Sequence, residues 1–387
     1  MPVKRLLMTP GPTPVPPEVF AAMSQPIVHH RTRDFRLLLD RLLERLRAVH
    51  ATEGDVLLFA ASGTGGMDGA VANLCSPGDR VLCVSAGNFG ERWIQIAEAY
   101  GCDVVPLRYE WGETPQPDDV AAALEEAGGA RAVFMTHSET STGVVADVDA
   151  IARRLAGSGA LTVVDAISSL GAVPIAQDES GIDVVVSGSQ KALMTPPGLA
   201  TTAVSSAALA AAEESRSPRF YFDWARNLKA LRADPPATVF TSAVSLAYGL
   251  DAALGMLLEE GLESVFDRHV RLGRACRAGV KAMGLELFSP DEDRSAVVTA
   301  IRAPEGVDGA EVIRLVRERH GMTIEGGRGP LVGKIVRIGH IGYVDVFDVI
   351  AALTAVEQAF SELGADVERG VAAAAALEAY GGEVVPA

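Results

Sequence analysis

Short apolar runs and amphipathic stretches alternate along the first two thirds of the chain. Apolar residues recur every three or four positions over 34–50, and a continuous apolar run follows at 54–60. The first pattern predicts a helix and the second a buried strand. The alternation continues with strand-like runs at 80–87, 131–137, 161–167 and 182–188 and helical patterns at 91–100 and 147–157.

Continuous apolar strands separated by helices are typical of a mainly parallel sheet with helices on both faces, so the predicted fold class is α/β. Sheets of this kind bind ligands beyond the carboxyl ends of their strands. Small and polar residues follow the predicted strands, in "ASGTGG", "AGNFG", "THSETSTG", "DAISS" and "SGSQK". We therefore expect the chemistry of this protein in these five segments.

The pattern changes after about residue 255. A long helical pattern covers 254–284, and strand-like runs at 296–303 and 334–342 are followed by two more helical patterns. The stretch 241–261 is predicted as a helix that bridges two domains, and the alanine-rich 367–387 as a peripheral helix. We predict three parts, namely an N-terminal arm at 1–20, a large domain at 21–255 and a smaller α+β domain at 256–387.

Composition narrows the class of protein. The chain has 387 residues, of which 48% are hydrophobic and 22% charged, and this mixture indicates a globular protein with a large core rather than a membrane or disordered one. The 34 basic and 50 acidic side chains give a formal net charge of −16, which repels nucleic acid. The N-terminal segment lacks an apolar stretch of signal-peptide length, so we expect a cytoplasmic protein.

The four cysteines do not form a recognisable motif. Cys75, Cys83, Cys102 and Cys276 show neither C-x-x-C spacing nor a nearby histidine pair. The sequence therefore predicts no metal site and no disulfide framework, and the cysteines are interpreted as small core residues.

The segment after the first predicted strand has the features of an anion site. Ser62, Gly63 and Thr64 stand where a strand turns into a helix, and free backbone N–H groups at a helix start attract anions. A plain helix cap explains the hydroxyl groups equally well. A dinucleotide fingerprint is excluded because Asp68 stands where a glycine is needed, and the segment before Lys334 is one residue too short for a P-loop.

Two charged residues follow buried strands. Asp165 ends one strand, where it could cap a helix or accept buried hydrogen bonds. Lys191 follows the next strand, either as a solvated surface lysine or as a nucleophile whose pKa is lowered by burial. A reactive lysine, a buried carboxylate and an anion site are together what a protein must supply to pyridoxal 5′-phosphate, and Phe89 offers an aromatic ring for stacking.

The chain resembles a known family, the class V (subgroup IV) aminotransferases, which are pyridoxal-phosphate-dependent transferases of fold type I. The likeness is to the alanine–glyoxylate and serine–pyruvate aminotransferases and extends over nearly the whole length. It rests on the segments "LLMTPGPTPVPP", "HHRTRDF", "SGTGGMDGAVANL", "GNFGERW", "THSETSTGV", "VVDAISSLG", "GIDVVVSGSQKALMTPPG", "TVFTSAV" and "KIVRIGHIGYVD".

The resemblance implies a role for each matching residue. Lys191 is implied as the cofactor anchor and proton carrier, Asp165 as the partner of the pyridine nitrogen, and Arg337 as the group that binds the substrate α-carboxylate, with Gly11 beside the substrate. Further cofactor contacts are implied for Phe89, Ile167, Thr140, Ser62, Gly63, Thr64 and Gln190, and for Thr238 and Thr241 from the second subunit of a homodimer.

Three positions depart from the animal enzymes of the family. Phe89 stands where tryptophan is common, Thr64 where histidine stands, and Thr238 where a tyrosine reaches in from the other subunit. Because of these departures, the family resemblance supports the cofactor more strongly than it supports a particular substrate.

The resemblance implies transamination between a small amino acid, alanine or serine, and a 2-oxo acid such as glyoxylate or pyruvate. Aspartate, phosphonate and ureidoglycine aminotransferases remain alternatives, as does a non-catalytic partner protein of the kind labelled as a hydrogenase subunit. A cysteine desulfurase is disfavoured because it needs a cysteine on a mobile C-terminal loop, whereas Cys276 lies within a helical pattern.

Overall fold

The structure is a computed structural model that describes residues 5–289 and 295–382. Its central sheet has seven strands in the order β2-β10-β9-β8-β5-β3-β4. The strands β9, β8, β5, β3 and β4 pair in parallel, whereas β10 is antiparallel to both of its neighbours. Their bounds are β2 (Asp55–Phe59), β3 (Arg80–Ser85), β4 (Asp103–Arg108), β5 (Ala132–Thr136), β8 (Leu161–Asp165), β9 (Val184–Gly188) and β10 (Ala200–Val204).

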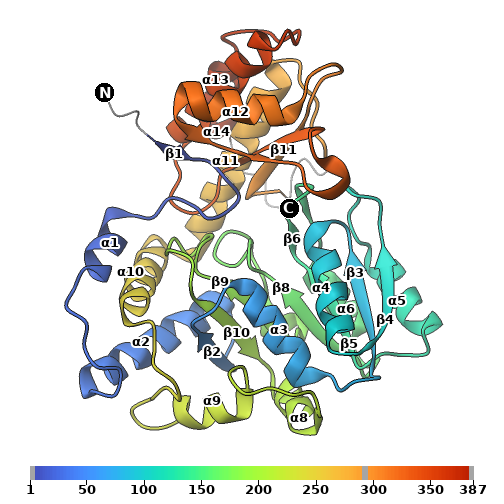
Figure 1. The fold of residues 1–387 in the computed structure, drawn as a ribbon, viewed down its shortest axis with the longest axis vertical. Coiled ribbons are helices and arrows are strands. Elements are labelled where there is room, and N and C mark those ends of the chain that lie inside the picture. Colours follow the sequence, from blue (N-terminus) through green and yellow to red (C-terminus); the bar gives the residue numbers. More distant parts are fainter. Residues whose placement is uncertain (1–4, 290–294, 383–387) are drawn as a thin grey trace.

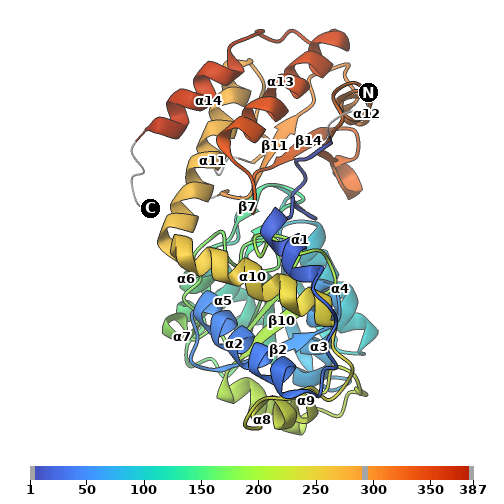
Figure 2. The same cartoon turned by 90° about the vertical axis from the view of Figure 1, so that its left-hand side faces the viewer.

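Helices cover both faces of this sheet, as Figures 1 and 2 show. One face packs against α2 (Arg33–His50), α5 (Pro117–Glu126), α6 (Val148–Leu155) and α10 (Val244–Glu260). The other face packs against α3 (Gly63–Leu74), α4 (Asn88–Ala99), α8 (Ser206–Glu214) and α9 (Trp224–Leu231). Two short helices, α1 (Pro17–Met23) and α7 (Gln177–Ser180), complete this part.

Neighbouring strand residues serve opposite faces. Val163 joins the cluster under α3 and α4, while Val164 joins the cluster under α2 and α10. A strand buried on both sides is mainly apolar along its length, because successive side chains point in opposite directions. The predicted α/β fold with a mainly parallel sheet is therefore confirmed.

The C-terminal part has its own sheet and core. The strands β11 (Val298–Arg302), β14 (Ile335–Gly339) and β13 (Glu325–Gly326) form an antiparallel sheet in that order. The helices α11 (Leu262–Ala282), α12 (Gly309–His320), α13 (Val346–Glu362) and α14 (Ala372–Gly381) surround a second hydrophobic cluster. The remaining short elements are β6 (Ser138–Glu139), β7 (Val144–Val145), β12 (Met322–Thr323) and the 3-10 turn η1 (Gly329–Leu331).

The N-terminal arm belongs spatially to this C-terminal part. β1 (Leu6–Leu7) pairs in parallel with β12, and the N–H of Gly339 donates to the carbonyl oxygen of Met8 at 2.8 Å. The arm then passes down to the large sheet, where the N–H of Thr13 donates to the carbonyl oxygen of Gln190 at 3.1 Å. It thus joins the two parts beside the Lys191 loop, as the blue segment in Figure 1 shows.

Three sequence expectations need correction. The helical pattern at 254–284 is interrupted at Gly261, whose φ of 84° ends α10 before α11 begins. The C-terminal alanine-rich helix is not peripheral, because Ala372 and Ala376 are buried in the second cluster; its last residues, 383–387, lie outside the described part. Cys102 is only partly buried, whereas the other three cysteines are core residues.

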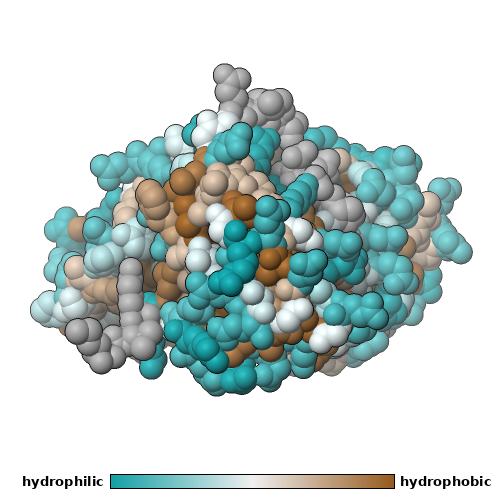
Figure 3. Space-filling view, turned by 90° about the horizontal axis from the view of Figure 1, so that it is seen from above, coloured by the Kyte–Doolittle hydropathy of each residue, from teal (hydrophilic) through white to brown (hydrophobic). Residues whose placement is uncertain are grey.

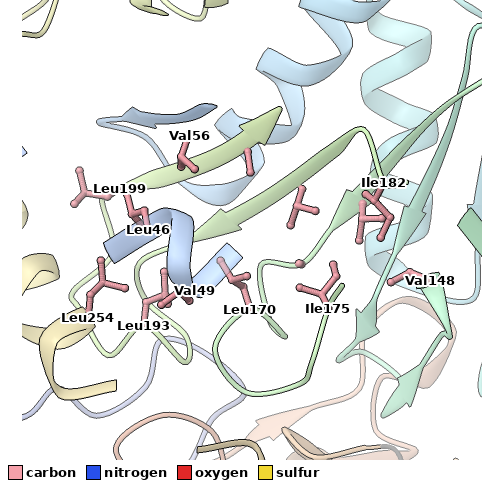
Figure 4. Close-up of a cluster of buried hydrophobic side chains, with 14 of the residues drawn as sticks. Leu46, Val49, Val56, Val148, Leu170, Ile175, Ile182, Leu193, Leu199 and Leu254 are labelled. Carbon is pink, nitrogen blue, oxygen red and sulfur yellow. The ribbon is translucent and has the colours of Figure 1, made fainter. Parts of the chain in front are cut away.

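The hydrophobic core fixes the loop that carries Lys191. Leu193, two residues after Lys191, and Leu199, just before β10, are both buried in the cluster that also contains Leu46 and Leu254 (Figure 4). The loop joins β9 to β10 directly without a crossover helix, so β10 must run antiparallel. The packing of these two leucines holds the loop that carries Lys191 against the core of the large sheet.

Within the described residues, no helix is long and apolar enough to cross a membrane, and no cluster of histidine, cysteine and acidic residues could hold a metal ion. The end of the molecule formed by the C-terminal part carries mainly hydrophilic residues with smaller hydrophobic areas between them (Figure 3).

Candidate active site

The turn between β2 and α3 presents free donors. Ser62 occupies the N-cap position, yet its hydroxyl makes no capping hydrogen bond. Its carbonyl oxygen accepts from Gly65 at 2.8 Å, while the N–H groups of Gly63 and Thr64 belong to the first turn, where a helix leaves such donors without internal partners. The capping explanation for the Ser62 hydroxyl is therefore wrong, and the turn can bind an anion.

A close approach explains the first glycine of this turn. A Cβ atom on Gly63 would lie 2.5 Å from Cδ1 of Ile167, which is closer than any real contact. Ile167 is buried and follows β8, so the Ser62 turn and the segment after β8 pack directly against each other.

Lys191 is buried at the joint between the arm and the large sheet. Its side chain is 8% exposed, and Nζ donates to the carbonyl oxygen of Pro10 at 2.6 Å. A Cβ on Gly11 would lie 2.3 Å from Nζ, so only glycine lets the arm pass here. The surface-lysine interpretation is therefore wrong. Burial lowers the pKa of Lys191 to about 8, with nearby Asp165 opposing the shift and Arg337 adding to it.

Asp165 ends β8 with its carboxylate inside the protein. It is 4% exposed, and Oδ1 accepts from the N–H of Ile167 at 2.8 Å. Burial raises the pKa of Asp165 to about 7, although the Ile167 hydrogen bond and the charges of Arg92 and Lys191 act against this. A buried acid and a buried amine thus both titrate near neutral pH, which is typical of functional sites.

The aromatic residue is held by a carboxylate that the sequence analysis did not single out. Glu139 is fully buried, and its Oε2 accepts from the N–H groups of Phe89 at 2.8 Å and Gly90 at 3.1 Å. Its other oxygen accepts from Ser141. Glu139 therefore ties the loop after β5 to the start of α4 and fixes the position of Phe89.

Arg337 enters the site from the C-terminal part. It is 1% exposed on β14; Nε donates to the carbonyl oxygen of Gly326 at 2.8 Å, and Nη1 donates to that of Thr140. Nη2 is buried without a hydrogen bond, 3.7 Å from the carboxylate of Glu325. Burial lowers the pKa of Arg337 to about 10. A buried guanidinium with an open donor is suited to a carboxylate ligand.

The remaining predicted residues divide into two groups. Gln190 lies in the Lys191 loop, and its buried Oε1 has no hydrogen-bond partner. Thr238 and Thr241 line a cavity together with Ala60, just before the Ser62 turn. The hydroxyl of Thr238 is engaged within the loop, where it donates to the carbonyl oxygen of Phe240 at 2.9 Å.

Thr241 is exposed and does not cap the following helix. α10 begins at Val244 with Ala243 at the N-cap position, two residues beyond Thr241. Of the two threonines, Thr241 is exposed and Thr238 is half-buried.

Comparisons with known proteins match nearly the whole chain. The family described as "Aminotransferase class-V" matches residues 5–343. The chain is 42% identical to the "Soluble hydrogenase, small subunit" of Synechococcus, over 93% of this chain and 94% of that protein. It is 39% identical to the serine–glyoxylate aminotransferase of Methylorubrum extorquens, over 97% of this chain and 96% of that protein.

Solved structures give the same result. The crystal structure of ureidoglycine–glyoxylate aminotransferase from Bacillus subtilis superposes with a TM-score of 0.93 and 33% sequence identity. The similarity covers 97% of this chain and 98% of that one.

The buried Asp165 charge should cost stability when no ligand is bound. Because its pKa rises from 3.8 unfolded to about 7 folded, the penalty is absent below the unfolded value, grows as pH rises between the two values, and is complete above about 7. We expect Asp165→Asn to stabilise the ligand-free protein at pH 8 by about 1–3 kcal/mol, and near pH 4 not at all.

Thermal unfolding at both pH values measures this effect. Asp118→Asn is the matched control, since that carboxylate is 88% exposed in its pair with Arg154. A melting temperature of Asp165→Asn at or below that of the unmodified protein at pH 8 would contradict the assigned burial cost.

Proposed function

The chain belongs to the class V aminotransferases, and from this premise we propose that it binds pyridoxal 5′-phosphate and transfers an amino group from alanine or serine to glyoxylate or pyruvate. The observation that carries the proposal is the buried Lys191 amine, whose pKa is lowered to about 8 and which shares one site with Asp165 and Arg337. Such a lysine can act as nucleophile and as base at neutral pH.

The residues present fit the cofactor. The Ser62 hydroxyl is free of a capping bond, next to a helix start that attracts a phosphate. Gly11 and Gly63 stand where a Cβ would collide with Lys191 and Ile167. The hydrogen-bond partner of the Lys191 amine is the neutral carbonyl of Pro10 and not a carboxylate, so this contact does not fix the amine in its charged form.

Each side chain then has a definite task. When bound, the cofactor supplies an electron sink that makes the Cα–H bond of an amino acid acidic. Arg337 binds the α-carboxylate through two parallel hydrogen bonds and so orients that C–H bond. The neutral amine of Lys191 would take the proton from Cα and deliver it to the bound cofactor rather than back to Cα, while ionised Asp165 would hold a proton at the ring nitrogen.

Glu325 favours small, uncharged donors. Its carboxylate lies 3.7 Å from the Arg337 guanidinium, beside the place proposed for the substrate carboxylate. A second acidic group on the substrate, as in aspartate or glutamate, would meet this negative charge. Arg328, which is exposed and lies three residues further along the chain, is the residue that could offset it.

Two other classes fit less well. Cys276 is buried in α11, and burial raises the pKa of its thiol to about 11, so it cannot serve as the exposed nucleophile of a cysteine desulfurase. A relative carries the name of a hydrogenase subunit, but a non-catalytic partner would have no need of a buried lysine, aspartate and arginine in one site.

The proposed reaction is tested with purified protein, pyridoxal 5′-phosphate, glyoxylate and a panel of amino donors. Glycine formation is expected with alanine or serine, and Lys191→Ala should abolish it while the protein stays folded. Turnover that survives in Lys191→Ala would refute the proposed role of this lysine.

The Lys191 pKa sets a pH dependence. Cofactor capture needs the neutral amine, whose fraction rises about tenfold per pH unit below the pKa and levels off above it. We therefore expect the second-order rate of capture by cofactor-free protein, followed by visible absorption, to rise steeply up to about pH 8 and then flatten. A rise that continues to pH 10 would mean that burial does not lower this pKa.

If the Arg337 guanidinium binds the α-carboxylate, replacing it should affect the KM of every amino donor alike. Arg337→Lys keeps a positive charge but cannot form two parallel hydrogen bonds to a carboxylate, so KM should rise for every amino donor by about tenfold or more. Steady-state kinetics with alanine, serine and aspartate measures this. A rise in KM confined to one donor would show that Arg337 contacts the side chain of that donor and not the α-carboxylate.

We further propose a homodimer in which Thr241 reaches the cofactor phosphate of the partner subunit. Thr241 is exposed beside a surface hollow lined by apolar and small residues, among them Ile27 at 73% exposure, Val28 and Leu246. An exposed apolar hollow of this kind supports burial against a second copy.

If the contact is made between subunits, cofactor retention and dimerisation are thermodynamically linked. Dilution should then release cofactor in parallel with dissociation, and Thr241→Ala should weaken cofactor binding without altering capture by Lys191. Analytical ultracentrifugation with absorption detection measures both quantities. A cofactor-loaded, active monomer would refute the shared site.

A further inference from the structure

The proposed phosphate site has a gap in its charge balance. The donors implied for it within one chain, Ser62, Gly63, Thr64 and Gln190, are all neutral. A phosphate monoester carries a charge of about −1.5 to −2 near neutral pH. The helix start of α3 offsets only about half a charge. A dianion placed at a partly buried turn therefore needs a further cation.

Arg92 lies at this turn and is not neutralised by the protein. Its Nη1 donates to Oγ1 of Thr64 at 3.1 Å, and its Cζ lies 4.8 Å from the ring centroid of Phe89. Among the described residues it makes no ion pair. Its neighbour Glu91 instead pairs with Arg108 at 2.8 Å.

The position of Arg92 follows from α4. Residues three apart on a helix lie on neighbouring parts of its surface, which brings the guanidinium of Arg92 over the ring of Phe89 in the preceding turn. Glu139 fixes that turn through the N–H groups of Phe89 and Gly90. The charge of Arg92 also reaches into the site, where it acts to lower the pKa of Asp165.

We propose that Arg92 is a cofactor-binding residue that supplies the positive charge for the cofactor phosphate, together with the Thr64 hydroxyl that it orients. The same guanidinium is a positioning group for Phe89, because its stacking holds the ring that covers the cofactor. The assignment rests on the proposed function, since it requires a phosphorylated cofactor with an aromatic ring.

The test compares a ligand that has the phosphate with one that lacks it. Cofactor-free protein is titrated with pyridoxal 5′-phosphate and with pyridoxal, and binding is followed by absorption and equilibrium dialysis. Arg92→Gln should weaken binding of pyridoxal 5′-phosphate by about tenfold or more and change binding of pyridoxal far less. Arg108→Gln is the matched control, because it removes the same charge from a surface pair outside the site.

Two further measurements separate charge from positioning. Raising the salt concentration should weaken phosphate-dependent binding more in the unmodified protein than in Arg92→Gln, because screening acts on the charge that the variant lacks. Arg92→Lys keeps the charge without the planar group, so it should recover most of the preference for the phosphorylated ligand.

Equal affinity of Arg92→Gln and the unmodified protein for pyridoxal 5′-phosphate would overturn the assignment. An equal loss for both ligands would overturn it as well, since the arginine would then act only on the ring or on the fold. Unmodified protein that captures neither ligand would refute the proposed function itself, and with it this role of Arg92.

Discussion

The rest of the site depends on one constraint, which is that the Lys191 amine is kept away from water without an acidic partner in contact. It donates a hydrogen bond to the carbonyl oxygen of Pro10, and burial makes the charged form of the amine costly. Asp165 lowers this cost from a distance but does not form an ion pair with it. The amine therefore remains partly neutral at physiological pH, which is the state that a nucleophile and base requires.

Both hydrophobic cores help to position this amine. Leu193 and Leu199 anchor the lysine loop in the core of the large sheet. The arm that covers Lys191 is held by β12 and by Gly339, where a Cβ would lie 2.2 Å from the carbonyl oxygen of Thr9. Arg337 lies two residues before Gly339 on the same strand. The group that would bind substrate and the segment that covers the lysine are thus positioned by one strand of the C-terminal part.

The hydrophobic pattern of the sequence predicted most helices and strands of the large sheet. The alternation of apolar runs and helical patterns is enough to predict the mainly parallel sheet, because strands buried on both faces are nearly continuous apolar runs. It did not predict β10, a five-residue strand in which two residues are alanine, or β4, which contains Pro106 at the sheet edge. The break at Gly261 was missed because apolar periodicity continues on both sides of it.

The sequence also indicated Lys191, Asp165 and the Ser62 turn, since each follows or ends a strand, and Arg337 through the family resemblance alone. Glu139 and Arg92 were not singled out, although both lie in segments that were noted. Their roles arise from contacts over long separations in the chain, Glu139 with Phe89 and Arg92 with Thr64, and a single sequence does not reveal such pairs.

Reductive trapping tests the central claim most directly. Purified protein is loaded with pyridoxal 5′-phosphate, treated with borohydride, digested and examined by mass spectrometry, which identifies the lysine that carries the cofactor. The account predicts a single modified peptide, with the cofactor on the Nζ of Lys191. Cofactor fixed mainly on another lysine, or distributed over surface lysines with Lys191 unmodified, would contradict it.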